Sequence, residues 1–248
     1  VSFMAVCIME ENGKMENGYA GRSYRKGFEF MTDDVVDVIA REVVDRTAIL
    51  FKAIKPKGGE MPVVMGSGGS GILLHEAIGH AFEADFNRKD ISIFAGQLNK
   101  KVCNEHINVV DDGTIPFNRG SVNFDDEGVE GQKTYIVKEG VLTSYLHDRI
   151  SAKHYGVNPT GNGRRDTFRN LPIPRMRATY MEAGNMKEAD IISTVKNGIF
   201  VDTFTNGQVQ IGAGDFTFFV KSGYLIEDGK LTQPIKAVSY THLRAHET

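Results

Sequence analysis

Residues 132–147, QKTYIVKEGVLTSYLH, indicate the fold class of this 248-residue chain. Two runs of β-forming residues flank Glu139-Gly140, and a glycine at that position suits a two-residue hairpin turn. Residues 215–238 repeat the arrangement about Asp228-Gly229. Strands joined by such short turns pair antiparallel, so the sequence predicts largely antiparallel sheets.

The segments before this hairpin add a further hairpin and a helix. An apolar run at 1–9 precedes Glu11-Asn12-Gly13, which has the composition of a turn. Thr32 suits a helix N-cap, and apolar residues then recur at helical spacing up to about Ala53. Further predicted elements are a strand at 61–65, a Gly-rich loop at 66–71, and helices at 72–86 and 186–197. The mixture predicts an α+β fold, with the helix at 72–86 packed on a sheet.

Composition limits the classes of function. The net charge of −3 gives no basic excess for a nucleic-acid surface, so no nucleic-acid partner is expected. Cys7 and Cys103 form no disulfide framework, which favours a reducing cytoplasm. No apolar run is long enough to span a membrane, and no signal peptide is expected. The chain begins without Met inside an apparent strand, so we expect the natural N-terminus to lie further upstream.

Residues 75–80, HEAIGH, resemble the zinc-protease motif H-E-x-x-H with one residue too many. On a regular α-helix, positions five apart differ by about 140°, so His75 and His80 would not share a face. A π-turn adds one residue to a turn and restores the relation of positions four apart. If the motif binds metal, we expect a helix distortion between the two histidines. Otherwise they are two unrelated helix histidines.

A zinc site needs a third protein ligand. The candidates are Glu83, Asp85, Cys103, His106, His147 and His154. Glu83 follows His80 by three residues and is expected to share its face. Cys103 and His106 lie in residues 100–113, a stretch that reads as strand-forming sequence.

The chain resembles the TldD/PmbA family, the so-called modulator-of-gyrase metalloproteases. The resemblance rests on GSGGSGILLHEAIGHAFEADFNRK (66–89), FDDEGVEGQ (124–132), PTGNGRRDTFRNLPIPRMRATYM (159–181) and GQVQIGAGDFTFFVKSGYLIEDGKLTQPIKA (207–237). It is similar to the TldD-type subunit, because the TldE (PmbA) type lacks the metal motif that His75, Glu76 and His80 complete here.

The resemblance implies a zinc peptidase acting on small or unfolded peptides, often assembled with a TldE/PmbA-like subunit. It implies His75 and His80 as zinc ligands and Glu76 as catalytic base. The family's third ligand is a cysteine in a CGKxGQ-like segment near the C-terminus, which this sequence lacks. We therefore expect the zinc site of this chain to be incomplete and the fragment to be inactive. The alternative is a non-catalytic peptide-binding or subunit-assembly protein of the same family.

The resemblance also predicts a domain division. Residues 1–60 are expected to be the end of an N-terminal domain with a connecting helix, and 61–238 an incomplete C-terminal-type metallopeptidase domain. The family pattern stops at SYTHLRAHET (239–248), which reads as a non-native tail. His242 and His246 in this tail imitate half a metal motif and are interpreted as decoys.

Other residues have candidate roles. Arg164 and Arg165 lie in an Arg-rich loop that is expected either to bind a substrate carboxylate or to pair with nearby acids. His154 is a candidate oxyanion stabiliser. The loop at 66–71 also fits G-x-G-x-x-G between a strand and a helix, which leaves a nucleotide-binding protein as a weaker alternative.

Overall fold

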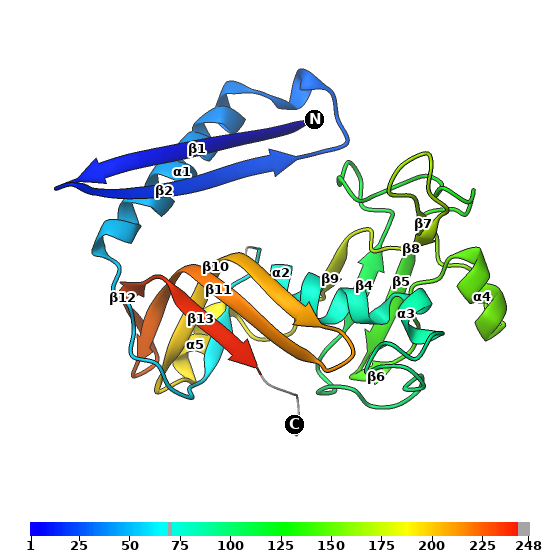
Figure 1. Ribbon diagram of the computed structural model, residues 1–248. Helices are drawn as coiled ribbons and strands as arrows, with labels where there is room; N and C mark the ends of the chain where they lie inside the picture. The colour runs from blue at the N-terminus through cyan, green and yellow to red at the C-terminus, as the bar shows by residue number, and fades with distance from the viewer. Residues whose placement is uncertain (69–70, 243–248) are drawn as a thin grey trace. The chain divides into compact units, whose positions relative to one another are not determined.

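The structure is a computed structural model that describes residues 1–68 and 71–242 (Figure 1). The described residues form two compact units. The first is built from the described residues of segments 1–70, 186–206 and 218–240, and the second from those of segments 71–185, 207–217 and 241–248. Each unit therefore combines segments that are far apart in the sequence.

The first unit begins with the predicted hairpin, in which β1 (Ser2–Glu11) pairs antiparallel with β2 (Lys14–Ser23). Asn12 and Gly13 both have positive φ, 51° and 78°, as a type I′ turn requires. After η1 (Phe28–Phe30), the helix α1 (Asp33–Lys52) runs along the hairpin (Figure 1). The hydroxyl of Thr32 caps α1 by accepting the N–H of Val35 at 3.4 Å, which confirms the predicted helix start.

The two faces of this hairpin differ. On one face, Phe3, Ala5, Cys7 and Ala20 pack with Ile39 and Val43 of α1. The opposite face carries five large apolar side chains that are each at least half exposed: Met4, Val6, Ile8, Met15 and Tyr19. The alternation along β1 thus buries one apolar row and exposes another.

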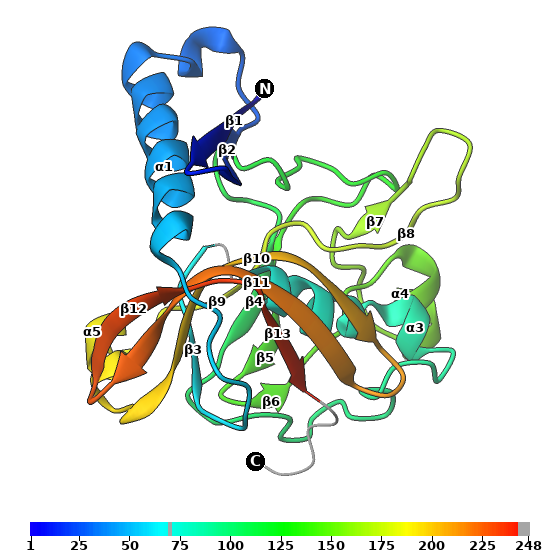
Figure 2. The same ribbon diagram turned by 60° about the vertical axis from the view of Figure 1, so that its left-hand side comes forward.

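The rest of the first unit is built on a sheet in the order β12-β11-β10-β3, with β13 paired to β11. Its strands are β3 (Val63–Met65), β10 (Asn197–Gln210), β11 (Asp215–Glu227), β12 (Lys230–Ile235) and β13 (Val238–His242). The strands β10 and β11 form a long twisted ribbon (Figure 2). The β3–β10 pair is parallel, unlike the antiparallel pairing of β11 with β12. The short helix α5 (Glu188–Ser193) contributes Ile192 to a core with Val64, Phe200 and Ile226.

The second unit contains an antiparallel sheet in the order β6-β5-β4-β9. Its strands are β4 (Val109–Asp112), β5 (Lys133–Lys138), β6 (Val141–Leu142) and β9 (Thr179–Met181). A small pair, β7 (Gly163–Arg164) with β8 (Ile173–Pro174), and α4 (Arg149–Tyr155) complete the unit. The core includes Phe82, Ile136, Leu142, Tyr145, Leu146 and Met176.

The α+β class and all three hairpins are confirmed. Glu139-Gly140 and Asp228-Gly229 both have positive φ at each residue, as at Asn12-Gly13. The strand reading of residues 100–113 is wrong outside β4, because the stretch before Val109 is irregular apart from a turn at 105–106 and an isolated bridge from Lys101 to Val141. No described helix is long and apolar enough to cross a membrane.

Candidate metal centre

The predicted helix at 72–86 is not a regular helix. It consists of α2 (Gly71–Leu73), the π-helical turn η2 (Leu74–Gly79), the 3-10 turn η3 (His80–Phe82) and α3 (Ala84–Asn87). The backbone N–H of His80 donates to the carbonyl oxygen of His75, five residues back, which is the bond of a π-turn. The helix distortion expected from the spacing of HEAIGH is therefore confirmed.

Packing explains why the turn forms here. Leu74 and Ile78 lie against the core of the second unit, so the π-turn is anchored on its apolar side. A Cβ at Gly79 would lie 2.1 Å from the sulfur of Met176, which is 3% exposed. Only glycine allows the buried Met176 to approach the helix backbone this closely.

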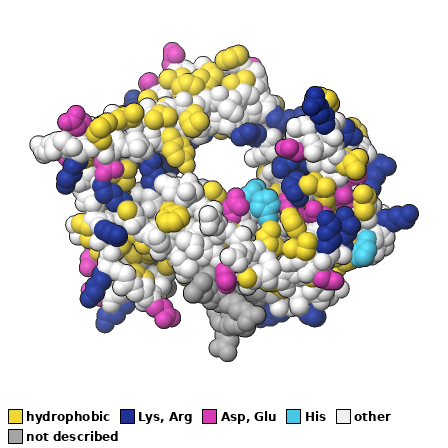
Figure 3. Space-filling view, viewed as in Figure 1, with side chains coloured by type: hydrophobic (Ala, Val, Ile, Leu, Met, Phe, Trp, Pro, Cys, Tyr) yellow, Lys and Arg dark blue, Asp and Glu magenta, His cyan; other side chains and the backbone are white. Residues whose placement is uncertain are grey.

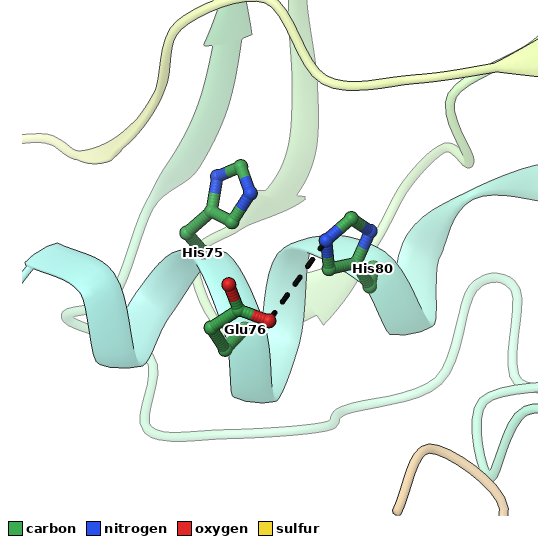
Figure 4. Close-up of side chains that lie close together, drawn as sticks. All are labelled: His75, Glu76 and His80. Atoms are coloured by element: carbon green, nitrogen blue, oxygen red, sulfur yellow. Dashed lines mark ion pairs between the residues drawn. The ribbon is translucent and has the colours of Figure 1, made fainter. Parts of the chain in front are cut away.

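The polar side of the same turn carries the motif. One ligand atom from each of His75, Glu76 and His80 lies within 4.8 Å of the others. The two imidazole centroids are 4.9 Å apart, and Glu76 Oε2 is 3.9 Å from His80 Nε2 (Figure 4). All three side chains lie together beside the turn instead of pointing to opposite sides of the helix (Figure 4).

This donor set fits a metal ion. Two nitrogens bound to one zinc ion at about 2.1 Å lie no more than about 4.2 Å apart. The observed ligand atoms lie within 4.8 Å of one another, close to that range, and His75 is exposed. Histidine and acidic side chains lie next to each other at the molecular surface, where a ligand has access (Figure 3). No other described group of His, Cys, Asp and Glu brings three ligand atoms this close together.

The surroundings of the two histidines shift their pKa values in opposite directions. Partial removal from water, followed by the neighbouring His80 ring, lowers the pKa of His75. A hydrogen bond to Glu83 raises the pKa of His80. His75 is therefore the more readily neutral ligand, whereas His80 holds a partner on its second ring nitrogen.

Glu83 lies beside His80, but not as part of the ligand cluster. Its Oε2 is 3.1 Å from His80 Nδ1, the ring nitrogen that is not directed at Glu76. Arg175 Nη1 donates to the same oxygen at 2.9 Å. Burial raises the pKa of this fully buried carboxyl, and the nearby His80 and Arg175 oppose that effect.

The other third-ligand candidates lie outside the described cluster. Asp85 is buried 3.8 Å from Arg175. Cys103 packs against the core of the second unit, and burial raises the pKa of its thiol, which disfavours the thiolate that binds metal. His106 is exposed, and His147 is 3% exposed against Tyr145 and Tyr155. His242 has no described side chain, and His246 lies outside the described residues.

The predicted substrate-binding residues have different surroundings. Arg164 is exposed, its charge contributes to lowering the pKa of His75, and its Nη1 donates to the Met176 carbonyl. Arg165 donates its backbone N–H to Asp126, and no described contact joins its side chain to the motif. His154 is exposed in the last turn of α4, with its ring edge against Tyr155. Only Arg164 of these three is linked to the histidine cluster.

Two supporting residues were not singled out from the sequence. Asp111 of β4 is buried and accepts hydrogen bonds from the side chains of Asn162 and Thr179 and from the backbone N–H of Arg177. Arg175 belongs to the same Arg-rich stretch as Arg164 and Arg165, and its sequence position alone does not distinguish it from them. A buried acid after two valines, in VVDDG at 109–113, was the available signal for Asp111.

The nucleotide-binding alternative gains no support. It rests on the loop at 66–71, of which residues 69 and 70 lie outside the described part of the chain. The helix after this loop, α2, has three residues before the π-turn begins.

Comparisons with known proteins show the family of the chain. Residues 58–242 match the model of the PmbA/TldA metallopeptidase C-terminal domain. The chain is 44% identical over 94% of its length to the metalloprotease TldD homolog of Haemophilus influenzae, and 39% identical over 93% to a metalloprotease of Methanocaldococcus jannaschii. A relative from Saccharolobus solfataricus, 32% identical over 87% of the chain and 48% of its own length, is named a zinc metalloprotease TldD homolog. The chain spans about half the length of these relatives, 49% and 50% for the first two.

Solved structures share the fold. TldE from Thermococcus kodakarensis superposes with a TM-score of 0.80 over 98% of this chain and 54% of its own, at 22% identity. A Thermotoga maritima protein described as a candidate modulator of a DNA gyrase superposes with a TM-score of 0.84 at 21% identity, over 98% of this chain and 54% of its own.

Proposed function

Because the chain belongs to the TldD/PmbA metallopeptidase family, we propose that it carries the zinc-binding helix of a peptidase that hydrolyses small or unfolded peptides. The observation that supports this most directly is the π-turn at Leu74–Gly79, which brings the ligand atoms of His75, Glu76 and His80 within 4.8 Å of one another. A regular helix would have separated the two imidazoles.

His75 and His80 are the proposed zinc ligands. Imidazole nitrogens suit zinc, and two of them from one helical turn are a common part of a peptidase zinc site. When bound, zinc polarises the peptide carbonyl and lowers the pKa of water, so that water becomes a nucleophile near neutral pH. The third protein ligand is left to a residue outside the described cluster.

Glu76 is the proposed general base. Its carboxylate lies 3.9 Å from His80 Nε2, and its side chain is 37% exposed, so water and a peptide reach it. It would take a proton from the attacking water and deliver that proton to the leaving amine. Arg164, through its proximity to His75, is a proposed contact for the substrate. Arg165 and His154 are weaker proposals for the same role.

The setting of the reaction is part of the proposal. We propose that residues 61–238 form the peptidase domain, which the family match at 58–242 supports. Assembly with a TldE/PmbA-like subunit is proposed from the family, and the shared fold with TldE supports it. Cys7 and Cys103 are both free thiols, which is in keeping with a proposed cytoplasmic location.

The test uses the complete gene product, with and without a TldE-like subunit, on unstructured peptides. Glu76→Gln should reduce kcat/KM by about 10²–10⁴-fold while zinc content is unchanged, because only proton transfer is removed. Glu105→Gln, an exposed acid paired with Lys101, is the matched control and should cleave normally. Equal cleavage by Glu76→Gln and the control would exclude Glu76 as the base. A zinc-free wild-type protein would favour the non-catalytic peptide-binding alternative.

A further inference from the structure

The two ring nitrogens of His80 face different partners. Nε2 is directed at the ligand cluster, 3.9 Å from the Glu76 carboxylate. Nδ1 is directed at Glu83, 3.1 Å from its Oε2. In a neutral imidazole one ring nitrogen carries the hydrogen and the other carries the lone pair that can bind metal. The hydrogen-bond partner of Nδ1 therefore decides whether Nε2 is free to bind metal.

Glu83 is placed at an energetic cost. Its side chain is fully buried, and its Oε1 has no hydrogen-bond partner among the described residues. A buried carboxylate is expensive unless it is paired, and an apolar side chain of similar volume is often as stable or more stable. Packing alone therefore does not account for a glutamate here.

Arg175 holds the Glu83 carboxyl in place beside His80. The guanidinium donates to Glu83 Oε2 at 2.9 Å and to the carbonyl oxygen of Pro174 at 2.6 Å. A guanidinium can only donate, so Oε2 acts as the acceptor in this contact. The same oxygen lies 3.1 Å from His80 Nδ1, an arrangement that favours a hydrogen on Nδ1 that donates to Oε2.

Resting on the proposed zinc site, we propose that Glu83, held by Arg175, is a positioning residue that fixes the Nδ1–H tautomer of His80 and thereby presents Nε2 to the metal. Carboxylates that accept the second N–H of a histidine ligand fix the ring orientation and make the ligand nitrogen more basic. Glu83 does not contact the metal or the substrate in this role. This assignment differs from the third-ligand role for which Glu83 was one of the candidates from the sequence.

A purely structural role makes a different prediction. The Glu83–Arg175 ion pair also joins the helix segment to the residue after β8, so its loss would destabilise the second unit whatever His80 does. Asp85 provides the matched control. It is buried, it lies two residues from Glu83, and it faces the same Arg175 at 3.8 Å. No described contact joins Asp85 to His80.

The first measurement needs no variant and no metal. Long-range ¹H–¹⁵N spectra of the metal-free wild-type protein, with His80 assigned by comparison with His80→Gln, report which ring nitrogen carries the proton. We expect Nδ1–H, whereas neutral histidine in water favours Nε2–H. A metal-free wild-type protein with His80 in the Nε2–H form overturns the proposal.

The second measurement is zinc affinity of the complete gene product, with zinc chloride in competition with a chromophoric chelator. Glu83→Leu should weaken zinc binding about 10–100-fold and shift His80 toward Nε2–H. Glu83→Gln keeps an acceptor oxygen without the charge, so it should weaken zinc binding less and keep Nδ1–H. Asp85→Asn should change the affinity by less than about threefold.

The outcomes separate this inference from the proposed function. A wild-type protein without zinc affinity removes the proposed function, while the tautomer still tests the Glu83–His80 contact. Wild-type binding that Glu83→Leu leaves unchanged keeps the proposed function and overturns the positioning role. If Glu83→Leu does not fold, Glu83→Gln decides, because weaker zinc binding than in Asp85→Asn supports the proposal and equal binding overturns it.

Discussion

The helix α1 and the segment 71–87 are both read from the sequence as amphipathic helices, yet they form in different ways. The helix α1 runs for 20 residues with one type of hydrogen bond and a capped start. The segment 71–87 passes through α, π, 3-10 and again α geometry. The first packs on the hairpin of β1 and β2, whereas the second presents the candidate metal ligands.

The difference lies in what fixes each backbone. Local sequence suffices for α1, where apolar residues at helical spacing meet a flat hairpin face. In the segment 71–87, contacts from distant residues decide the geometry. Met176 approaches Gly79, and Leu146 exchanges backbone hydrogen bonds with Phe82 and Ala84 at 3.0 Å each. Irregular backbone of this kind is energetically costly and persists only where the surrounding structure supports it. It is found most often at functional sites.

The largest expected effect comes from single-residue deletions. Deletion of Ala40 rotates the rest of α1 by about 100°, so Val43 and Leu50 leave the core, and we expect a loss of about 3 kcal/mol or more. Deletion of Ala77 leaves the sequence HEIGH, which fits H-E-x-x-H, and removes the surplus residue of the π-turn. The shortened segment can then form a regular helix whose flanking residues keep the same packing contacts. We expect a cost below about 2 kcal/mol and retained zinc binding.

Urea unfolding of both deletion variants, with zinc titration of the second, measures the contrast. Equal losses of stability would mean that the π-turn does not act as a one-residue insertion. Loss of zinc binding with preserved stability would mean that the turn has a geometry that H-E-x-x-H cannot replace.

The next effect concerns pH and the residue that follows Leu146, whose backbone pairs with the irregular segment. His147 follows Leu146 directly, and burial lowers its pKa from 6.5 to about 4, with Asp148 opposing the shift. The unfolded chain then binds more protons than the native protein between these values. Stability is therefore fully present above pH 6.5 and falls by about 3 kcal/mol as pH decreases to about 4. Unfolding midpoints of wild type and His147→Phe across this range measure the effect.

The phenylalanine keeps the ring contacts with Tyr145 and Tyr155 but does not titrate. We expect His147→Phe to have a flatter stability profile between pH 4 and 6.5. A profile as steep as that of wild type would assign the acid sensitivity to other groups.

The smallest expected effect on stability comes from two opposite substitutions, one in α1 and one in the π-turn. Gly→Ala normally stabilises a helix and Ala→Gly destabilises it, by up to about 1 kcal/mol. Ala40→Gly on the exposed side of α1 should follow this rule. Gly79→Ala should instead destabilise by about 1–3 kcal/mol, because its Cβ overlaps the sulfur of Met176. Thermal unfolding measures both.

Met176→Ala provides the control for the second substitution. Combined with Gly79→Ala, it should cost less than the sum of the two single changes, since the overlap is then absent. Strict additivity would show that Met176 is not the obstacle.

Sequence patterns predicted the parts of the molecule that local physics determines. The turns at Asn12-Gly13, Glu139-Gly140 and Asp228-Gly229 and the Thr32 cap depend on neighbouring residues. The distorted HEAIGH helix was expected only on the premise that the motif binds metal, because distant contacts fix its backbone. The role of Glu83 did not follow, because its position three residues after His80 fits a metal ligand and a hydrogen-bond partner equally well. Arg175, 92 residues further along the chain, distinguishes the two. The strand β10 was also missed, and its pairing with β3, which lies far earlier in the chain, leaves no local signal in the sequence.

The exposed row of Met4, Val6, Ile8, Met15 and Tyr19 has a consequence for the protein in solution. With a net charge of only −3, electrostatic repulsion between molecules is weak. Association through this hairpin face should therefore limit the concentration at which the protein stays monodisperse. Replacing Val6 and Ile8 with threonine would keep the strand propensity and raise the concentration at which light scattering first increases.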